Sequence, residues 1–218
     1  EAIKSSISDE TAAILIEPIQ GEGGIRLLPE QCLKGIREIC DEKDILLILD
    51  EVQCGVGRTG KLFAHEWAEI EPDIMMVAKG IGGGFPLGAV LAKENAASGM
   101  TAGTHGSTYG GNPLGCSIGL KVMDIISDPN FLYDVNRKAK LFRDGLMELL
   151  KKNTSIFEEV RGKGLMLGLK CKVKNIDVVN AAYSNKLLTV PAGDNVVRLL
   201  PPLTISDKDI NEALNKLD

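Results

Sequence analysis

The stretch ILLILD at residues 45–50 is a run of five aliphatic side chains that ends in an aspartate. Two similar runs lie on either side of it along the chain, AAILIE at 12–17 and DIMMVAKG at 73–80. Between the first two runs, apolar residues follow Pro29 at helical spacing. Continuous hydrophobicity is typical of strands in a parallel sheet that helices cover on both faces. The sequence therefore predicts an α/β fold with a mainly parallel sheet and flanking helices.

The pattern changes after Asn112, where apolar residues at helical spacing predict a helix that ends at Asp128-Pro129. We place a domain boundary there, between residues 1–127 and residues 128–218. In the second part we expect a long amphipathic helix at 131–152, strands at 158–160 and 165–171, a helix at 177–186, strands near Leu188 and at 196–200, and a closing helix after the cap residue Ser206. This order predicts a small α+β domain.

Composition excludes several classes of protein. The 218 residues include 25 basic and 30 acidic side chains, a net charge of −5, without a basic run, which argues against binding to nucleic acid. The longest aliphatic run, 45–49, is far shorter than the ~20 residues that cross a bilayer, and no N-terminal segment has the pattern of a signal peptide. The five cysteines are scattered and lack metal-ligand spacing, so we expect reduced thiols, a cytoplasmic protein and no bound metal.

Two ionisable residues end neighbouring predicted strands. Asp50 ends the run at 45–50, and Lys79 ends the run at 73–80, where half of the 24 glycines of the chain begin to cluster. Alone, each is ordinary, because aspartates often end strands and a lone lysine is usually solvated. Together they bring a carboxylate and an amine to the edge of a parallel sheet where ligands gather. That pair suits pyridoxal phosphate, which requires a covalent amine and a protonated ring nitrogen.

The segment GVGRTGK at 55–61 matches two nucleotide-binding patterns by its letters. Four residues separate the preceding strand from Gly55, whereas the dinucleotide fingerprint requires the strand to run directly into its first glycine. The P-loop pattern requires serine or threonine where Leu62 stands. A tight turn is the better interpretation, and a P-loop ATPase stays as a much weaker alternative.

Five segments in register resemble the class III aminotransferases, and most of all those that act on acetylornithine. They are EPIQGEGG at 17–24, LDEVQCGVGRTGKLFAHE at 49–66, AKGIGGGFPLGA at 78–89, HGSTYGGNPLGC at 105–116 and VRGKGLMLGL at 160–169. The resemblance implies the aminotransferase-like fold (fold type I). Residues 1–127 would be the later half of the large cofactor-binding domain, and residues 128–218 the small C-terminal domain.

The resemblance also assigns cofactor-binding residues. Lys79 would bind pyridoxal 5'-phosphate covalently and move a proton between the substrate carbon and the cofactor, work that needs a lowered amine pKa. Asp50 would keep the pyridine nitrogen protonated. Val52 would pack against the ring and Gln53 would bond its phenolic oxygen, and Glu51, between Asp50 and Val52, would be a further cofactor-binding residue. These assignments make Lys79 and Asp50 the expected catalytic residues.

Other matching positions concern the phosphate and the substrate. Thr108 would reach the cofactor phosphate across a subunit interface, which implies a homodimer, and its neighbour Ser107 would contact the substrate. Arg161 would bind the substrate α-carboxylate through two parallel hydrogen bonds. Glu22 would mask that arginine when the other substrate is bound, and Glu17 would support the site.

The resemblance implies a transaminase that moves the distal amino group of N2-acetylornithine to 2-oxoglutarate, in arginine biosynthesis. An ω-aminotransferase for ornithine, succinyldiaminopimelate or 4-aminobutyrate is the nearest alternative. The chain begins at Glu1 without a methionine, and residues 1–16 hold no counterpart of the family's upstream substrate- and phosphate-binding motifs. We therefore also expect a fragment with weak cofactor binding and negligible turnover of its own.

Overall fold

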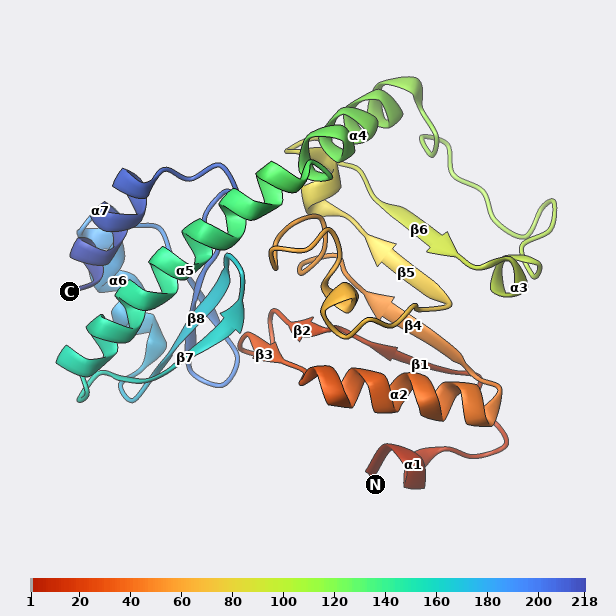
Figure 1. Ribbon diagram of the computed structural model, residues 1–218, viewed down its shortest axis with the longest axis horizontal. Coiled ribbons are helices and arrows are strands. Elements are labelled where there is room, and N and C mark those ends of the chain that lie inside the picture. The colour runs from red at the N-terminus through yellow and green to blue at the C-terminus, as the bar shows by residue number, and fades with distance from the viewer. Residues whose placement is uncertain (1) are drawn as a thin grey trace. The chain divides into compact units, whose positions relative to one another are not determined.

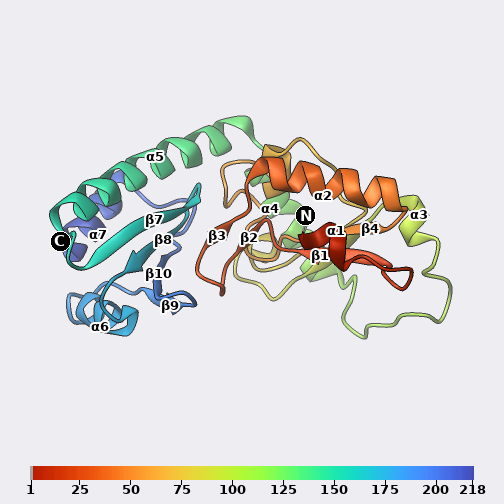
Figure 2. The same cartoon turned by 90° about the horizontal axis from the view of Figure 1, so that it is seen from below.

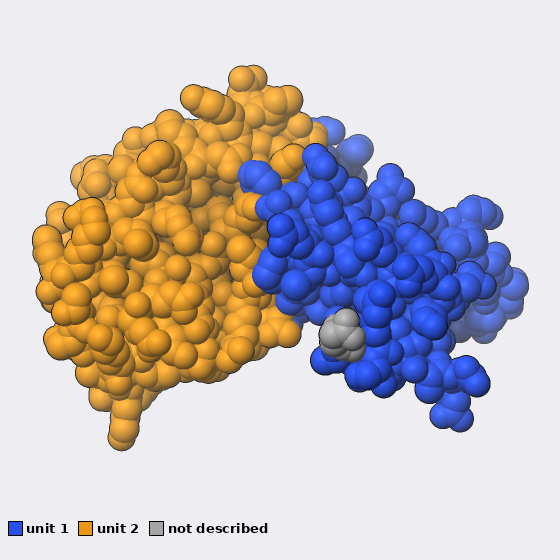
Figure 3. Space-filling view, turned by 60° about the horizontal axis from the view of Figure 1, so that its bottom comes forward, with its two compact units in different colours: residues 1–18, 28–56, 63–125 blue, residues 19–27, 57–62, 126–218 orange. Residues whose placement is uncertain are grey.

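The computed structural model describes residues 2–218, and the chain divides into two compact units (Figure 3). The first unit comprises the chain up to Pro18 together with residues 28–56 and 63–125. The second comprises residues 19–27, 57–62 and 126–218. Two short segments from the first half of the sequence therefore pack with the second half, which the hydrophobic pattern alone does not indicate.

The first unit is built on a four-stranded sheet in the order β1-β4-β5-β6 (Figure 1). Strands β1 (Ala13–Ile16), β4 (Leu46–Asp50) and β5 (Ile74–Val77) are parallel, and β6 (Ala89–Ala92) is antiparallel to β5. The three predicted strands are confirmed, whereas β6 was not predicted. All four residues of β6 are exposed, and a run of four residues between Gly88 and Lys93 carries little periodic signal.

Helix α2 (Glu30–Lys43) covers one face of this sheet. Its buried residues Leu33, Ile36 and Cys40 pack with Leu47 and Leu49 of β4. The helix ends at Asp44, whose backbone is left-handed. Leu15 and Val90 point to the opposite face and are 61% and 68% exposed, so the described residues of the first unit leave part of that face uncovered, unlike the predicted two-sided cover.

The first unit also contains five helical elements, α1 (Ala2–Ser6), η1 (Ala64–Trp67), η2 (Lys79–Gly82), α3 (Glu94–Ala97) and α4 (Pro113–Ile126), the last residue of which belongs to the second unit. Helix α4 confirms the helix predicted after Asn112. The Asn112 side chain accepts a hydrogen bond from the Gly115 amide at 2.8 Å, which satisfies one of the free N–H groups of the first turn.

The second unit is built on an antiparallel sheet in the order β7-β8-β10-β9 (Figure 2). Its elements are α5 (Pro129–Lys152), β7 (Phe157–Lys163), β8 (Met166–Cys171), α6 (Asn175–Ser184), β9 (Val190–Ala192), β10 (Val196–Leu199) and α7 (Asp207–Leu217). This succession confirms the predicted elements. Asp128 and Ser206 cap α5 and α7 by accepting hydrogen bonds from backbone N–H groups.

The two faces of this second sheet differ. Alternate residues of the sheet, among them Leu167, Leu169 and Val197, face α5 and α7 and form the core with Leu146 of α5 and Ile210 of α7. The other face carries charged side chains, and the hairpin of β2 (Ile19–Gln20) and β3 (Arg26–Leu27) joins this unit, with β3 in contact with β7. This hairpin, which was not predicted, brings the turn at residues 21–24 into the second unit.

Asp73 connects α2, β4 and the start of β5. Its Oδ2 accepts hydrogen bonds from the Leu47 amide at 2.8 Å and from Arg37 Nη1 at 2.7 Å, and its side chain is 11% exposed. Burial alone would raise the pKa of Asp73, but the Leu47 N–H and the Arg37 guanidinium outweigh it and hold the pKa below its usual value. A carboxyl of this kind stabilises the fold above the pKa of the unfolded chain, and that stability is lost as the pH falls through the lower folded pKa.

We expect Asp73→Asn to lower the free energy of unfolding by about 2 kcal/mol at pH 7, because a charged acceptor for two donors is lost. The difference from wild type should shrink as the pH falls below about 4, the pKa of an unfolded aspartate, and through the lower pKa of folded Asp73. Urea unfolding followed by circular dichroism at pH 7 and pH 3 measures this. Asp41→Asn is the control, since the Asp41 side chain pairs with the same arginine but is 65% exposed. Equal losses for Asp73→Asn at both pH values would contradict the charge-based account.

Candidate active site

Asp50 and Lys79 lie at the carboxyl ends of adjacent parallel strands. Asp50 is the last residue of β4 and is the register partner of Met76 on β5, and Lys79 follows β5 directly, after Ala78. The Asp50 Oδ1 accepts a hydrogen bond from the Val52 amide at 2.9 Å, which orients the carboxylate at the strand end. The Lys79 residue is exposed. The topology therefore brings the two predicted catalytic residues to one edge of one sheet, as expected from the sequence.

The backbone around Lys79 is strained and open. Lys79 has a φ of 48°, a left-handed conformation that a residue with a side chain adopts only at a cost of about 1–3 kcal/mol. Gly83 and Gly84, with φ values of 55° and 113°, follow within the same turn. Because these residues carry no side chains, the amine lies at a strand end with little cover from its own segment.

Glu51 has a different environment from its neighbour Asp50. Its side chain is fully buried, and its carboxylate accepts hydrogen bonds from the amides of Ala64 and His65, at 2.6 and 2.9 Å, and from His65 Nδ1 at 2.8 Å. These contacts hold the segment that begins η1. The resemblance lists Glu51 among residues that contact the cofactor, whereas the structure gives its carboxylate to the loop that follows the strand.

The other predicted residues of the first unit lie in loops. Val52 and Gln53 are half-buried in the turn after β4, and Glu17 is half-buried directly after β1. Ser107 and Thr108 are exposed in the segment between α3 and α4, where Ser107 Oγ accepts a hydrogen bond from the Gly110 amide at 2.9 Å.

The segment GVGRTGK does not have P-loop geometry. Its glycines allow close packing, because a side chain on Gly60 would begin 2.1 Å from Asn136 Oδ1 on α5, whose amide nitrogen donates to the Gly60 carbonyl at 2.7 Å. A P-loop lysine opens a helix, but after Lys61 the next helical element is the four-residue η1 at Ala64. Arg58 donates to the carbonyls of Leu165 and Pro201, and burial lowers its pKa. The segment is therefore a structural turn, of which residues 57–61 belong to the second unit, and this favours the interpretation preferred from the sequence.

In the second unit, the structure pairs Glu22 with Arg198 and not with Arg161. Arg198 lies on β10, its side chain is 9% exposed, and its Nη1 donates to Glu22 Oε1. Arg161 on β7 instead donates to Glu159 Oε2 and Asp194 Oδ2, both at 2.7 Å. The predicted arginine for Glu22 and the observed one therefore differ.

Sequence reasoning missed Arg198, although a signal was present. In VVRLLPPL at 196–203 a single arginine interrupts a buried apolar strand, with Val197 and Leu199 on either side. A buried guanidinium needs an anionic partner, so this position alone requires a nearby carboxylate.

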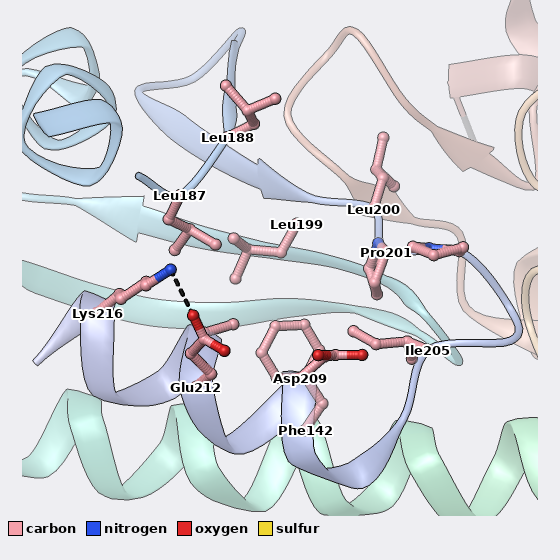
Figure 4. Close-up of a pocket in the computed structure, with 12 residues that line it drawn as sticks. Phe142, Leu187, Leu188, Leu199, Leu200, Pro201, Ile205, Asp209, Glu212 and Lys216 are labelled. Carbon is pink, nitrogen blue, oxygen red and sulfur yellow. Dashed lines mark ion pairs between the residues drawn. The ribbon is translucent and has the colours of Figure 1, made fainter. Parts of the chain in front are cut away.

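A cavity of about 430 Å³ lies elsewhere in the second unit (Figure 4). It is lined by Phe142 of α5 and by apolar side chains of the segments around Leu188 and Pro201, while α7 contributes mainly polar side chains, among them the Glu212–Lys216 ion pair. None of the residues predicted for the active site lines it.

Within residues 2–218, no group of three or more histidine, cysteine, aspartate or glutamate side chains is placed to hold a metal ion. None of the described helices is both long enough and apolar enough to cross a membrane.

Comparison with known proteins identifies a family that matches this chain. The aminotransferase class-III family matches residues 1–218. An acetylornithine aminotransferase of Rhodobacter capsulatus is 66% identical over 218 residues, which are 100% of this chain and 56% of that relative.

Solved structures agree with this match. The N-acetylornithine aminotransferase of Stenotrophomonas maltophilia K279a superimposes with a TM-score of 0.86 at 39% identity, over 94% of this chain and 55% of that one. An ornithine aminotransferase of Toxoplasma gondii, whose active site is partly occupied by pyridoxal phosphate, has a TM-score of 0.88 at 35% identity, over 94% of this chain and 50% of that one. The chain spans about half the length of the curated relatives it matches.

Proposed function

The chain belongs to the class III aminotransferase family, and from this we propose that the protein containing it is a pyridoxal-phosphate-dependent transaminase. It takes the distal amino group of N2-acetylornithine and passes the nitrogen to 2-oxoglutarate, a step of arginine biosynthesis in the cytoplasm. The observation that carries the proposal is the placement of Asp50 and Lys79 at the ends of adjacent parallel strands. The 66% identity to an acetylornithine aminotransferase supports the choice of amino donor.

The residues of the first unit fit pyridoxal phosphate. Lys79 provides an exposed amine for covalent attachment, and the Asp50 carboxylate, oriented by the Val52 amide, can hold a proton on the ring nitrogen. Val52 and Gln53 follow Asp50 directly and would contact the ring. When bound, the cofactor supplies an electron sink for the negative charge that develops on the substrate carbon.

Three residues of this chain act around that chemistry. The Lys79 amine would accept the proton from the substrate carbon and return it at the neighbouring position. The Asp50 carboxylate would hold a proton on the ring nitrogen and so support electron withdrawal as the substrate carbon loses its proton. Glu51 supports Asp50 by fixing the loop at residues 64–65 rather than by contacting the cofactor.

We assign the α-carboxylate of glutamate to Arg198, in place of Arg161. A nearly buried guanidinium can bind a carboxylate through two parallel hydrogen bonds, and Glu22 already occupies it with a carboxylate of its own. Glu22 would stay on Arg198 while the acetylated donor reacts and would yield to the α-carboxylate of glutamate. One site would then accept both substrates.

We expect Arg198→Lys, in the full-length protein, to lower kcat/KM for glutamate about 100-fold, which corresponds to about 2.7 kcal/mol. A lysine is a point charge and cannot form the bidentate contact. Single-turnover kinetics of the glutamate half-reaction measure the loss. Arg161→Lys is the matched control and should stay within a few-fold of wild type for glutamate. The reverse pattern would restore the assignment made from the sequence.

A homodimer is part of the proposal. Ser107 and Thr108 lie in the segment at 101–112, all but one of whose residues are exposed, and Tyr109 in the same segment is 82% exposed. Such a segment is available to reach a cofactor phosphate bound by a second copy of the chain.

The substrate is tested by offering the full-length protein N2-acetylornithine, ornithine, succinyldiaminopimelate and 4-aminobutyrate, each with 2-oxoglutarate. We expect ping-pong kinetics and the highest kcat/KM for the acetylated donor. A clear preference for ornithine would favour the alternative represented by the matching ornithine aminotransferase structure. No transamination with any donor would refute the proposal.

A further inference from the structure

Arg161 and Arg198 lie in one row across the charged face of the second sheet. Both are register partners of Gly168, Arg161 from β7 and Arg198 from β10. Cross-strand partners point to the same face, so the glycine separates two arginines that face the same side. A side chain on Gly168 would begin within 3.0 Å of both Val196 and Ile25, so this position stays small to admit the β2–β3 hairpin.

The turn at residues 21–24, which carries Glu22, is fixed to this face through its backbone. The Gly193 amide donates to the Glu22 carbonyl at 2.8 Å. Arg161 Nη1 donates to the Gly24 carbonyl at 3.3 Å. Ile25, at the end of the turn, is fully buried. The Glu22 side chain is thus the exposed part of an anchored turn, since Glu22 is exposed while Gly21 before it and Gly24 and Ile25 after it are buried.

Asp194 links this anchor to the sheet. Its carboxylate pairs with Arg161 Nη1 at 2.7 Å, with Lys170 Nζ at 2.9 Å and with Arg26 Nη2 at 3.1 Å. Arg161 and Lys170 come from β7 and β8, and Arg26 comes from β3 beyond the turn. The Asp194 carboxylate therefore joins two strands of the sheet to the hairpin. Asp194 directly follows Gly193, whose amide binds the turn.

The cationic neighbours of Asp194 stabilise its ionised form. Hydrogen bonds from Lys170 and then Arg161 lower the pKa of Asp194 to about 2, so its carboxylate is ionised at neutral pH. Its backbone φ of 53° is left-handed, a conformation in which aspartate is better tolerated than most residues. The position thus combines a required backbone shape with three cationic partners.

We propose that Arg161 and Asp194 are positioning residues that hold the turn at 21–24 in place, so that Glu22 alternates on Arg198 by moving its side chain alone. The inference rests on the proposed function, in which Glu22 covers Arg198 for the acetylated donor and uncovers it for glutamate. A fixed turn places the Glu22 carboxylate on Arg198 without ordering the backbone at each cycle. Loosening the turn weakens the covered state, whereas glutamate binds the uncovered state and does not need it.

The test uses Asp194→Asn and Arg161→Lys in the full-length holoenzyme. Single-turnover kinetics measure the two half-reactions separately, one with N2-acetylornithine and one with glutamate. We expect kcat/KM for N2-acetylornithine to fall about tenfold and that for glutamate to stay within about threefold, the size of an ordinary coupling between two sites. In a Glu22→Gln background, the added substitution should lose its selective effect, because the coupled partner is already disabled.

Hydrogen exchange gives a second readout that does not depend on activity. The peptide covering 19–27 should exchange faster in Asp194→Asn, because the anchor of the turn is weakened. Asp207→Asn is the matched control, since Asp207 forms an exposed ion pair with Arg137 in the same unit, and it should change neither the donor ratio nor the exchange.

The possible results distinguish failure of the proposed function from failure of the positioning role. Wild-type protein that turns over neither donor removes the proposed function and the selectivity role with it. In an active wild type, equal slowing of both half-reactions by Asp194→Asn, or unchanged exchange at 19–27, overturns the positioning role and leaves the proposed function intact.

Discussion

Replacing Lys79 by alanine in the full-length protein is expected to lower turnover by about 10⁴-fold or more and to remove the visible absorbance of covalently held cofactor. The structure gives the reason. Lys79 lies just after β5, beside the end of β4, and it is an exposed residue with a left-handed backbone. Alanine leaves neither a covalent attachment nor a group that can move the proton. Absorbance spectra with added pyridoxal phosphate, together with steady-state rates, measure both effects.

Lys61→Ala is the matched control for that experiment. Lys61 ends the segment GVGRTGK, and its alanine variant should keep its absorbance and most of its rate because the segment is a structural turn. Normal turnover in Lys79→Ala would contradict the assignment. Magnesium-dependent nucleotide binding that disappears in Lys61→Ala would instead support the ATPase alternative.

Asp50→Asn is expected to lower kcat by about 10³-fold, or about 4 kcal/mol, with a smaller change in KM. Asparagine can still accept the Val52 N–H, so the turn should keep its shape while the negative charge opposite the ring nitrogen is lost. The cofactor should still attach to Lys79, which spectra can verify before rates are measured at saturating cofactor.

The same substitution at an exposed position, Asp41→Asn, controls for a general effect of removing an aspartate and should leave kcat unchanged. An unchanged kcat in Asp50→Asn would mean that the carboxylate does not support electron withdrawal by the ring. Failure to hold cofactor at all would assign Asp50 to binding rather than to rate.

The placement of Asp50 and Lys79 at one edge of the sheet could be predicted because the information for it is local. Each run of aliphatic residues defines one strand, and chain order fixes which residue follows it. Asp50 is the last residue of β4, and Lys79 lies just beyond β5. Parallel pairing then brings both ends to one edge without further knowledge. Such positions follow from periodicity alone.

The pairing of Glu22 with Arg198 could not be predicted in the same way. Glu22 and Arg198 are 176 residues apart, and nothing in the periodicity chooses between Arg198 and Arg161 as the partner of the glutamate. Which arginine pairs with Glu22 depends on the unpredicted β2–β3 hairpin, whose turn packs on the sheet face that carries both arginines and Gly168. The environment of Glu51 was also hidden from the sequence: it follows Asp50 directly, but its carboxylate binds the amides of Ala64 and His65, because adjacent residues at a strand end point to opposite sides.

The central claim of the proposed function is that pyridoxal phosphate is attached to Lys79. Reducing the full-length holoenzyme with borohydride makes the linkage permanent, and digestion followed by mass spectrometry then locates the added group. We predict that the peptide containing Lys79 carries it and that the peptide containing Lys61 does not. A label on a different lysine, or no labelled peptide from a protein that shows transaminase activity, would contradict the account.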